Sequence, residues 1–282
     1  MSSAVKQAIV PALWSGQLGK VVSQGYDQQV RKGWRFIPDS LNDLFDWAEV
    51  VDDDHPGSAG TRLYHLVYAQ DITPDAVGGR CTVTIVLQGF LGAHALGVLG
   101  NWRGKERDAQ SASQFLVLES GGCDVAFKAQ VEALLNVRRL IAMRLGGDVE
   151  GFDEAAKTIT LRRHVFTRVK STDDGTVPRV TLTDVTDPYG HARAMAKMWR
   201  VDHTVRVSIR RSNGTVVDVV PDVLKRGDFV EVTASARIEV MRSRKRRGVN
   251  VQFEMHEVVR LLTAPEVKVC VDYVALNNVL VK

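Results

Sequence analysis

Apolar and polar residues alternate with a period of two through the segment from Gly227 to Leu261. In "FVEVTASARIEV" (229–240) all even-numbered residues are apolar, and all odd-numbered residues after Phe229 are polar. The following segment "VNVQFEM" (249–255) keeps its apolar residues at odd numbers. Such alternation is typical of a strand that has one face on a core and the other in solvent. The pattern therefore predicts two long, paired strands.

The alternation slips by one residue at "HEVV" (256–259), where Glu257 is polar and Val258 is apolar. An extra residue in one of two paired strands, a β-bulge, produces such a slip and bends the sheet. The slip therefore predicts a bulge in the second strand and a sheet that curls towards a barrel.

Helical spacing of apolar residues is found in three other segments. "PDSLNDLFDWAEVV" (38–51) predicts a helix capped by Asp39 or Ser40, and 124–144 has the longest helical pattern, stopped by Gly146 and Gly147. "GHARAMAKMW" (190–199) suits a short helix, whereas residues 2–30 suggest broken helix or loop.

Strand patterns account for much of the remaining sequence. Alternation predicts strands in segments 61–70, 80–90, 113–120, 157–169, 179–185 and 203–211, and "SNG" (212–214) predicts a tight hairpin. We therefore expect an α+β, mainly β protein, with a mixed α+β region of unknown role in residues 1–150 and a barrel in residues 151–282. This boundary is placed by "GGDVEGFD" (146–153) and by a shift in charge.

Charge is distributed unevenly between the two parts. Residues 1–150 hold 14 Lys and Arg against 17 Asp and Glu, a net charge of −3, and residues 151–282 hold 23 against 16, a net charge of +7. A basic half joined to an acidic half suggests that the second half has a polyanionic partner.

The highest density of positive charge lies at the turn between the two long predicted strands. "RSRKRRG" (242–248) contains five cations, namely Arg242, Arg244, Lys245, Arg246 and Arg247. Like charges so close together repel one another, whereas each phosphate that they neutralise on a nucleic acid releases a counterion. Nucleic-acid contact is the favoured interpretation. A solvated hairpin tip and a nuclear import signal remain the alternatives, and the import signal is compatible with binding.

The segment "LKRGDFVEVTASARIEV…GVNVQFEMHEVVRLL" resembles the last two strands of the OB-fold single-stranded-DNA-binding proteins. About 40 residues carry the resemblance, through a short helix, a Lys-x-Gly turn, a valine-rich strand, a basic hairpin and a returning strand. The matching positions are Leu224, Lys225, Gly227, Val230, Val232, Val251, Val258 and Leu261. The resemblance implies a small closed barrel that binds a strand between its hairpin loops. The large N-terminal half has no counterpart in that family, and no acidic tail is found.

Single-strand binding also requires surface rings on which bases stack, and cations along the groove. Phe229 is the first ring candidate because it lies on the polar face of its strand, and Trp199 and Tyr189 are weaker ones. The groove candidates are six cations of the predicted barrel, namely Arg206, Arg210, Arg211, Lys225, Arg226 and Arg237.

Signatures of catalysis and of cofactor binding are not found. The phosphate-loop pattern fails at "GNWRGKE" (100–106), and no HExxH, GxSxG or GxGxxG motif occurs. "DDDH" (52–55) could be imagined as a divalent-metal site, but adjacent residues rarely converge on one ion. We therefore predict no cofactor, no metal and no enzymatic activity.

The location of the protein is predicted from its cysteines and its first residues. Three distant cysteines, Cys81, Cys123 and Cys270, suit a reduced intracellular protein. No secretory leader or membrane-spanning segment is predicted, and the basic run would direct the protein to the nucleus in a eukaryote and leave it cytoplasmic otherwise.

Together these features predict a non-enzymatic protein that binds single-stranded DNA or RNA, with DNA favoured, and homo-oligomerisation is left open. Two alternatives remain: a β-rich viral coat subunit whose basic loop packages nucleic acid, and a metal-dependent nuclease that uses the acidic loop.

Overall fold

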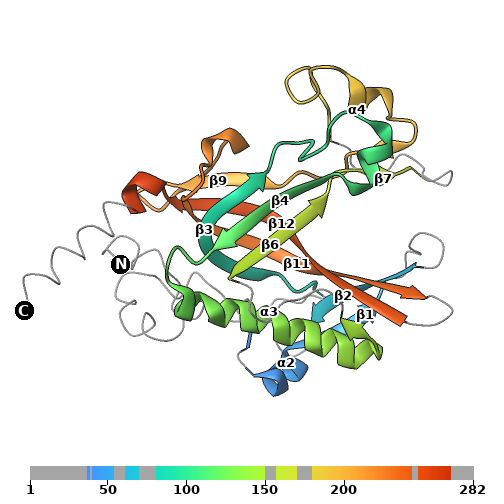
Figure 1. Cartoon of the computed structure of the whole chain (residues 1–282), viewed down its shortest axis with the longest axis vertical. Helices are drawn as coiled ribbons and strands as arrows, with labels where there is room; N and C mark the ends of the chain where they lie inside the picture. The colour runs from blue at the N-terminus through green and yellow to red at the C-terminus, as the bar shows by residue number, and fades with distance from the viewer. Residues whose placement is uncertain are drawn as a thin grey trace, which may run out of the picture.

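Figure 1 shows a mainly β protein in which one large curved sheet carries a long helix along one side. This computed structural model describes residues 37–38, 40–53, 61–69, 81–149, 157–169, 180–242 and 247–267. The predicted broken helix or loop at residues 2–30 lies outside the described residues. Across the ranges that are described, no helix is long and apolar enough to span a membrane.

Ten strands form the large sheet, and two short strands pair separately. The ten are β1 (Ala48–Asp52), β2 (Thr61–Tyr68), β3 (Ile85–Ala95), β4 (Ser113–Glu119), β5 (Asp148–Val149), β6 (Thr158–His164), β9 (Arg206–Arg210), β10 (Val216–Asp218), β11 (Phe229–Arg242) and β12 (Arg247–Leu262). The separate pair is β7 (Thr167–Arg168) and β8 (Trp199–Arg200). The helical segments are α2 (Leu41–Trp47), α3 (Asp124–Leu145), α4 (His191–Ala194), and the 3-10 turns η3 (Glu106–Ser111) and η4 (Pro221–Val223).

The antiparallel pair β11 and β12 forms the centre of this sheet, as the alternation predicted. The strands follow the order β10-β9-β12-β11-β3-β4-β6. The outer edge of β11 is shared, because β3 pairs with its first part (229–234) and β2 with its last part (237–241). β11 is therefore hydrogen-bonded on both sides along most of its length.

The predicted bulge is confirmed at His256. In the register of β11 and β12, Thr233 faces Glu257 and Ala234 faces Met255, so His256 has no partner residue. A second register shift follows between Phe229 and Val230. Both irregularities increase the local bend of the strands.

The predicted closed barrel is corrected to a curled but open sheet. The far edge strand β6 returns to contact β12. The guanidinium of Arg163 on β6 donates a hydrogen bond to the backbone oxygen of Met255 over 3.2 Å. Among the described strands, however, no backbone ladder joins β6 to β12. A long side chain bridges an edge that a closed barrel would join by backbone hydrogen bonds.

The predicted helix at 124–144 is confirmed as α3, which lies along the sheet (Figure 1). Its predicted apolar stripe is buried: Val131, Leu134, Leu135, Leu140 and Ile141. Gly146 ends the helix in the left-handed conformation, with φ 64°.

A buried glutamine of α3 fixes the helix to β3. The side chain of Gln130 accepts a hydrogen bond from the backbone N–H of Gln88 and donates one to its backbone oxygen, both over 2.9 Å. This part of β3 precedes the segment (90–95) that pairs with β4. The amide of Gln130 therefore satisfies backbone groups that the neighbouring strand does not reach.

Most of the smaller predicted elements are also confirmed. Ser40 caps α2, α4 forms within 190–199, and the "SNG" turn joins β9 to β10. The strand predicted at 179–185 is wrong: its described part contains no strand, and 184–186 form a turn. The Thr186 hydroxyl accepts from the backbone N–H of Thr183, and such local bonds compete with strand pairing.

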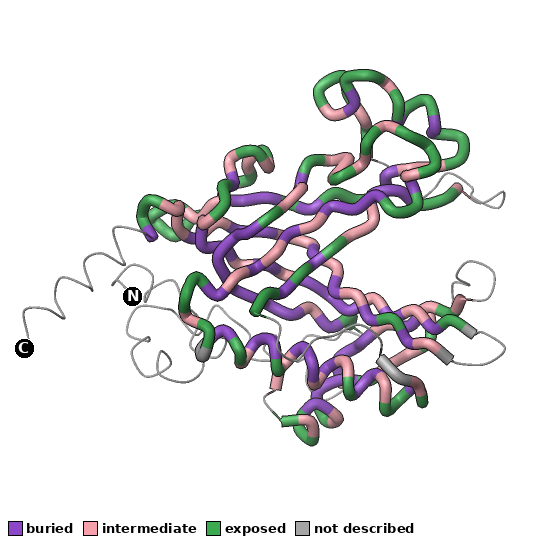
Figure 2. The backbone as a smooth tube through the Cα atoms, in the orientation of Figure 1, coloured by how far each residue is buried: buried purple, intermediate pink, exposed green. Residues whose placement is uncertain are grey.

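Buried residues form two separate clusters. The larger one lies between the sheet and the helices α2 and α3 and includes residues on both sides of position 150, so the predicted domain boundary remains a prediction. The smaller one, of seven buried side chains including Phe166 and Met195, holds together residues 98–112, 165–169 and 180–201. We call these residues the outer lobe. Figure 2 shows its backbone as largely exposed, on the side of the sheet away from α3.

Candidate nucleic-acid interface

The five predicted cations of the hairpin tip lie at the end of β11 and β12. The last register pair joins Arg242 to Arg247, so these two residues belong to the strands, although their side chains are not described. Arg244, Lys245 and Arg246 lie outside the described residues. The structure therefore describes the base from which the basic tip extends.

That base is four strands wide. β2 pairs with β11 as far as Met241, and β5 pairs in parallel with β12 at Gly248 and Val249. The apolar side chains of Ile238 and Val240 are fully buried beneath the pairing. The tip thus extends directly from a packed sheet and not from a free two-stranded arm.

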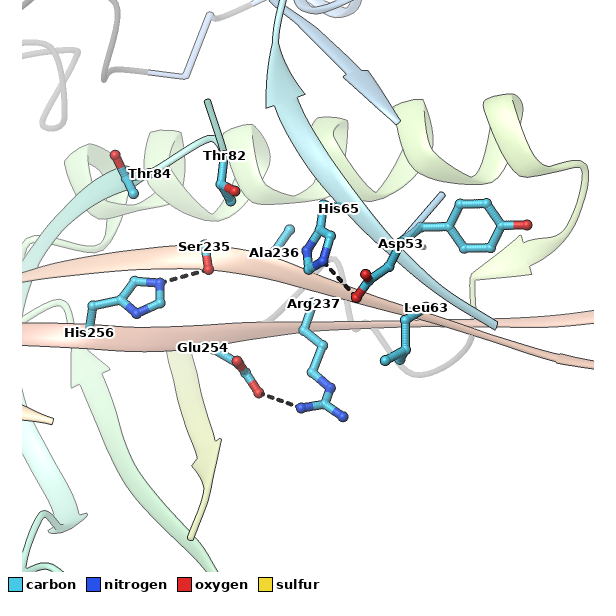
Figure 3. A pocket seen from close by; sticks show the side chains of 11 residues that line it. Asp53, Leu63, His65, Thr82, Thr84, Ser235, Ala236, Arg237, Glu254 and His256 are labelled. Atoms are coloured by element: carbon cyan, nitrogen blue, oxygen red, sulfur yellow. Dashed lines mark hydrogen bonds and ion pairs between the residues drawn. The ribbon is translucent and has the colours of Figure 1, made fainter. Parts of the chain in front are cut away.

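Arg237, a predicted groove residue, is held by two carboxylates on the polar face of the hairpin. Its guanidinium donates to Glu239 over 2.9 Å. It also donates to Glu254 over 3.2 Å, as Figure 3 shows. Burial lowers the pKa of Arg237, but Glu254 and Glu239 outweigh it through charge and hydrogen bonds, so the net pKa is raised. The positive charge of Arg237 is therefore already neutralised by carboxylates of the protein.

Three further groove candidates are also paired with carboxylates. Exposed Arg206 contacts Asp218 over 2.8 Å and Glu257 over 3.6 Å. Arg210 lies 3.9 Å from Glu231, and Arg226 lies 3.6 Å from Glu119. A phosphate would have to displace these carboxylates, and exposed ion pairs of this kind are weak because water and salt screen them.

The remaining two groove candidates are exposed and make no ion pair within the described part of the chain. Arg211 begins the turn between β9 and β10, and its backbone N–H donates to the oxygen of Thr215. Lys225 precedes a turn at Gly227, whose φ of 88° favours glycine. The carboxylate of Asp228 accepts the backbone N–H of Lys225 over 2.9 Å. Both cations are therefore free to meet an anion.

Phe229, the first ring candidate, is corrected to a core residue. Its exposed fraction is 0%, and its ring lies 5.1 Å from that of Phe90, its register partner on β3. At this end of β11 both faces of the strand are covered by other residues. The odd-numbered face therefore begins as part of the core at Phe229, and its polar residues start at Glu231. Stacking on a base is closed to this ring in the described structure.

The other two rings belong to the outer lobe. Trp199 is half-buried against the smaller core. Tyr189, the weaker candidate from the sequence, is 83% exposed, and its ring stacks on that of His191 with 5.8 Å between centroids and 28° between planes. Exposure reverses the order in which the sequence placed these rings.

A hollow of about 510 Å³ lies between β2, β11 and β12, on the polar face of the hairpin. Figure 3 shows His65 bonded to Asp53 over 2.9 Å on one side, and His256 bonded to Ser235 over 2.7 Å on the other. With Arg237 and Glu254 also in its wall, the hollow holds carboxylates as well as cations. This mixed lining suits a phosphate poorly.

The contact between Ser235 and His256 is not a hydrolytic pair. The guanidinium of Arg163, which can only donate, lies 2.9 Å from Nδ1 of His256. Nδ1 must therefore accept, so Nε2 carries the proton and donates it to the Ser235 hydroxyl. Burial and then the charge of Arg163 lower the pKa of His256, which keeps the ring neutral. A general base would need Nε2 unprotonated.

The acidic segment "DDDH" is described only at its first two residues. Asp52 lies 3.7 Å from Arg62, and Asp53 is bonded to His65, so the two carboxylates have separate partners. Asp54 and His55 lie outside the described residues. In the ranges that the structure covers, no group of three or more His, Cys, Asp or Glu is placed to hold a metal.

The sequence matches no protein-family model and no curated protein. Among solved structures, the chain is similar to gp2.5, a single-stranded DNA binding protein encoded by bacteriophage T7, at 14% identity and a TM-score of 0.36, over 64% of this chain and 92% of that one. It is also similar to the single-stranded DNA-binding protein from bacteriophage Enc34 in complex with ssDNA, at 9% identity and a TM-score of 0.27, over 75% of this chain and 94% of that one. TM-scores this low do not establish a shared fold.

Proposed function

We propose that the chain binds single-stranded nucleic acid, with DNA preferred over RNA, and catalyses no reaction. The observation that carries the proposal is the basic tip: five cations in six residues, from Arg242 to Arg247, follow directly from a sheet four strands wide. The strand residues on either side of this run belong to a packed sheet, so the dense positive charge follows directly from a well-paired base.

The phosphate backbone is the part of the ligand that the tip recognises. Each phosphate that is neutralised on a single strand releases counterions. The logarithm of the affinity therefore falls by about 0.7 for each unit of log salt concentration and for each such phosphate, and the salt slope below is the size of this fall. Arg211 and Lys225, which make no ion pair among the described residues, lie at the end of β11 and β12 opposite to the tip, so they add a separate positive site. The paired arginines Arg206 and Arg237 contribute only if a phosphate replaces their carboxylates. Sequence preference is therefore slight.

The experiment is a fluorescence titration with a labelled oligo-dT, a matched RNA and a duplex over a series of salt concentrations. Substitution of Arg244, Lys245 and Arg246 by Ala should weaken binding to oligo-dT and lower the salt slope by roughly 2, because three phosphate contacts are lost.

A matched control removes three positive charges from α3 and from the residue that pairs with its first turn. Lys128, Arg139 and Lys157 are exposed on or beside α3, and their change to Ala should leave the salt slope unchanged. Equal affinity for duplex and single strand, or an equal loss in both triple variants, would contradict the proposal. Sedimentation of the protein alone tests the coat-subunit alternative, which requires large particles without nucleic acid.

A further inference from the structure

Tyr189 combines high exposure with a rigid support. Its exposed fraction of 83% contrasts with that of the buried ring of Phe229. The preceding Asp187 is buried, accepts the backbone N–H of Arg193 over 2.9 Å and lies 3.5 Å from the guanidinium of the same arginine. The backbone N–H of Gly190 donates to the oxygen of Asp187. The turn therefore fixes the chain on both sides of an exposed ring.

His191 backs this ring and connects it to a neighbouring loop. The imidazole stacks on Tyr189, and a Cβ built on Gly104 would lie only 2.7 Å from its Nδ1. The loop that contains Gly104 thus lies against the histidine. Since Tyr189 is mostly exposed although one side meets His191, a flat face remains open to another ring.

Several exposed cations belong to the outer lobe, and two of them are the chain neighbours of Gly104. Arg103 and Lys105 stand on either side of Gly104 in the chain, and both are exposed. Arg168 and Lys197 are further exposed cations of the outer lobe. None of these four makes an ion pair with any described residue, unlike four of the six groove candidates of the sheet region. A phosphate would meet these charges without displacing a carboxylate.

We propose that Tyr189, supported by His191, stacks on a base of the bound strand, and that Arg103 and Lys105 contact the adjoining phosphates. This inference rests on the proposed single-strand binding and adds a second contact site, on the outer lobe, to the basic tip. Stacking on an aromatic ring is tolerant of base identity, which agrees with slight sequence preference.

The test compares Tyr189→Ala and Tyr189→Phe with Val185→Ala, a change at a residue of the same lobe that is 90% exposed. Tyr189→Ala should weaken binding to oligo-dT by roughly ten-fold, the effect of one lost stacking contact, with the salt slope unchanged. Tyr189→Phe and Val185→Ala should retain the affinity of the wild type. On an oligonucleotide of abasic sites, wild type and Tyr189→Ala should bind equally, because no base remains to stack.

The phosphate contacts are tested by Arg103→Ala combined with Lys105→Ala, which should lower the salt slope by about 1.4. Thermal unfolding of every variant identifies a change that acts through folding. If the wild type binds oligo-dT and Tyr189→Ala binds equally well, the stacking site is overturned and the proposed function stands. If the wild type binds no single strand, the proposed function itself fails.

Discussion

The face of the central hairpin and the outer lobe differ in the exposure of their rings and in the pairing of several of their cations, although Arg193 of the lobe is also paired with carboxylates. On the hairpin and the strands beside it, Arg237, Arg206 and Arg210 are bonded to or close to carboxylates, and the ring of Phe229 is in the core. On the outer lobe Tyr189 is exposed, and cations such as Lys105 make no ion pair among the described residues.

The comparison shows that the number of arginines on a strand does not by itself predict how strongly the strand binds phosphate. When a guanidinium that already contacts a carboxylate binds a phosphate, the binding free energy is only the difference between the two interactions. We therefore expect the strongest binding elements at the hairpin tip, where the sequence concentrates positive charge, and at those cations of the outer lobe that make no ion pair among the described residues, with the paired arginines contributing less.

The largest expected effect separates the two rings by stability. Phe229→Ala removes a fully buried ring that packs on Phe90 and should lower the free energy of unfolding by about 3–5 kcal/mol. Tyr189→Ala removes an exposed ring and should change it by less than about 0.5 kcal/mol. Urea unfolding followed by circular dichroism measures both. Similar losses in the two variants would show that the rings do not differ as described.

A smaller effect concerns Arg206, which is paired with carboxylates. Here the substitution is expected to raise the affinity for oligo-dT, whereas the other binding-site substitutions lower it. Asp218→Asn keeps a polar group beside Arg206 but removes the closer of its two carboxylate charges and leaves Glu257. The less neutralised guanidinium should raise the affinity for oligo-dT by roughly two- to five-fold and steepen the salt slope by up to about 0.7. The same salt titration measures both quantities.

Glu132→Gln is the matched control for this change. Glu132 pairs with Lys128 on α3, so its loss alters the net charge by the same amount without touching Arg206. A gain in affinity as large as that of Asp218→Asn would show that net charge, and not the release of Arg206, controls binding.

The long elements could be predicted from sequence because one dominant pattern decides each of them. The alternation of β11 and β12, the slip at His256 and the helical stripe of α3 all depend on the burial of one face, which the sequence records directly. The strand predicted at 179–185 was wrong because local bonds of Thr183 and Thr186 favoured a turn over pairing.

The candidate site could be predicted less well, because exposure and pairing depend on distant segments. Phe229 lies on the polar face by parity, yet β3 brings Phe90 against it. Arg206 meets Asp218 only because β9 and β10 pair. The contact of Gly104 with His191 joins segments 87 residues apart. No local pattern indicates such contacts, whereas the basic tip was visible as a simple run of charge.

The smallest expected effect is a pH dependence of stability that comes from a histidine of the hairpin and not from one of the outer lobe. The pKa of His256 is lowered by burial and by Arg163, so the unfolded chain takes up a proton at a higher pH than the folded one. Its contribution to stability is present above the ordinary histidine pKa of about 6.5 and is lost as the pH falls through the lower folded value. The urea midpoint of the wild type should therefore drop between pH 7.5 and 5.5, and the drop should be smaller in His256→Gln. His191→Gln, which changes a ring of the outer lobe and leaves the contacts of His256 with Arg163 and Ser235 intact, should keep the drop of the wild type. An equal drop in wild type and His256→Gln would contradict a neutral, half-buried imidazole at the bulge.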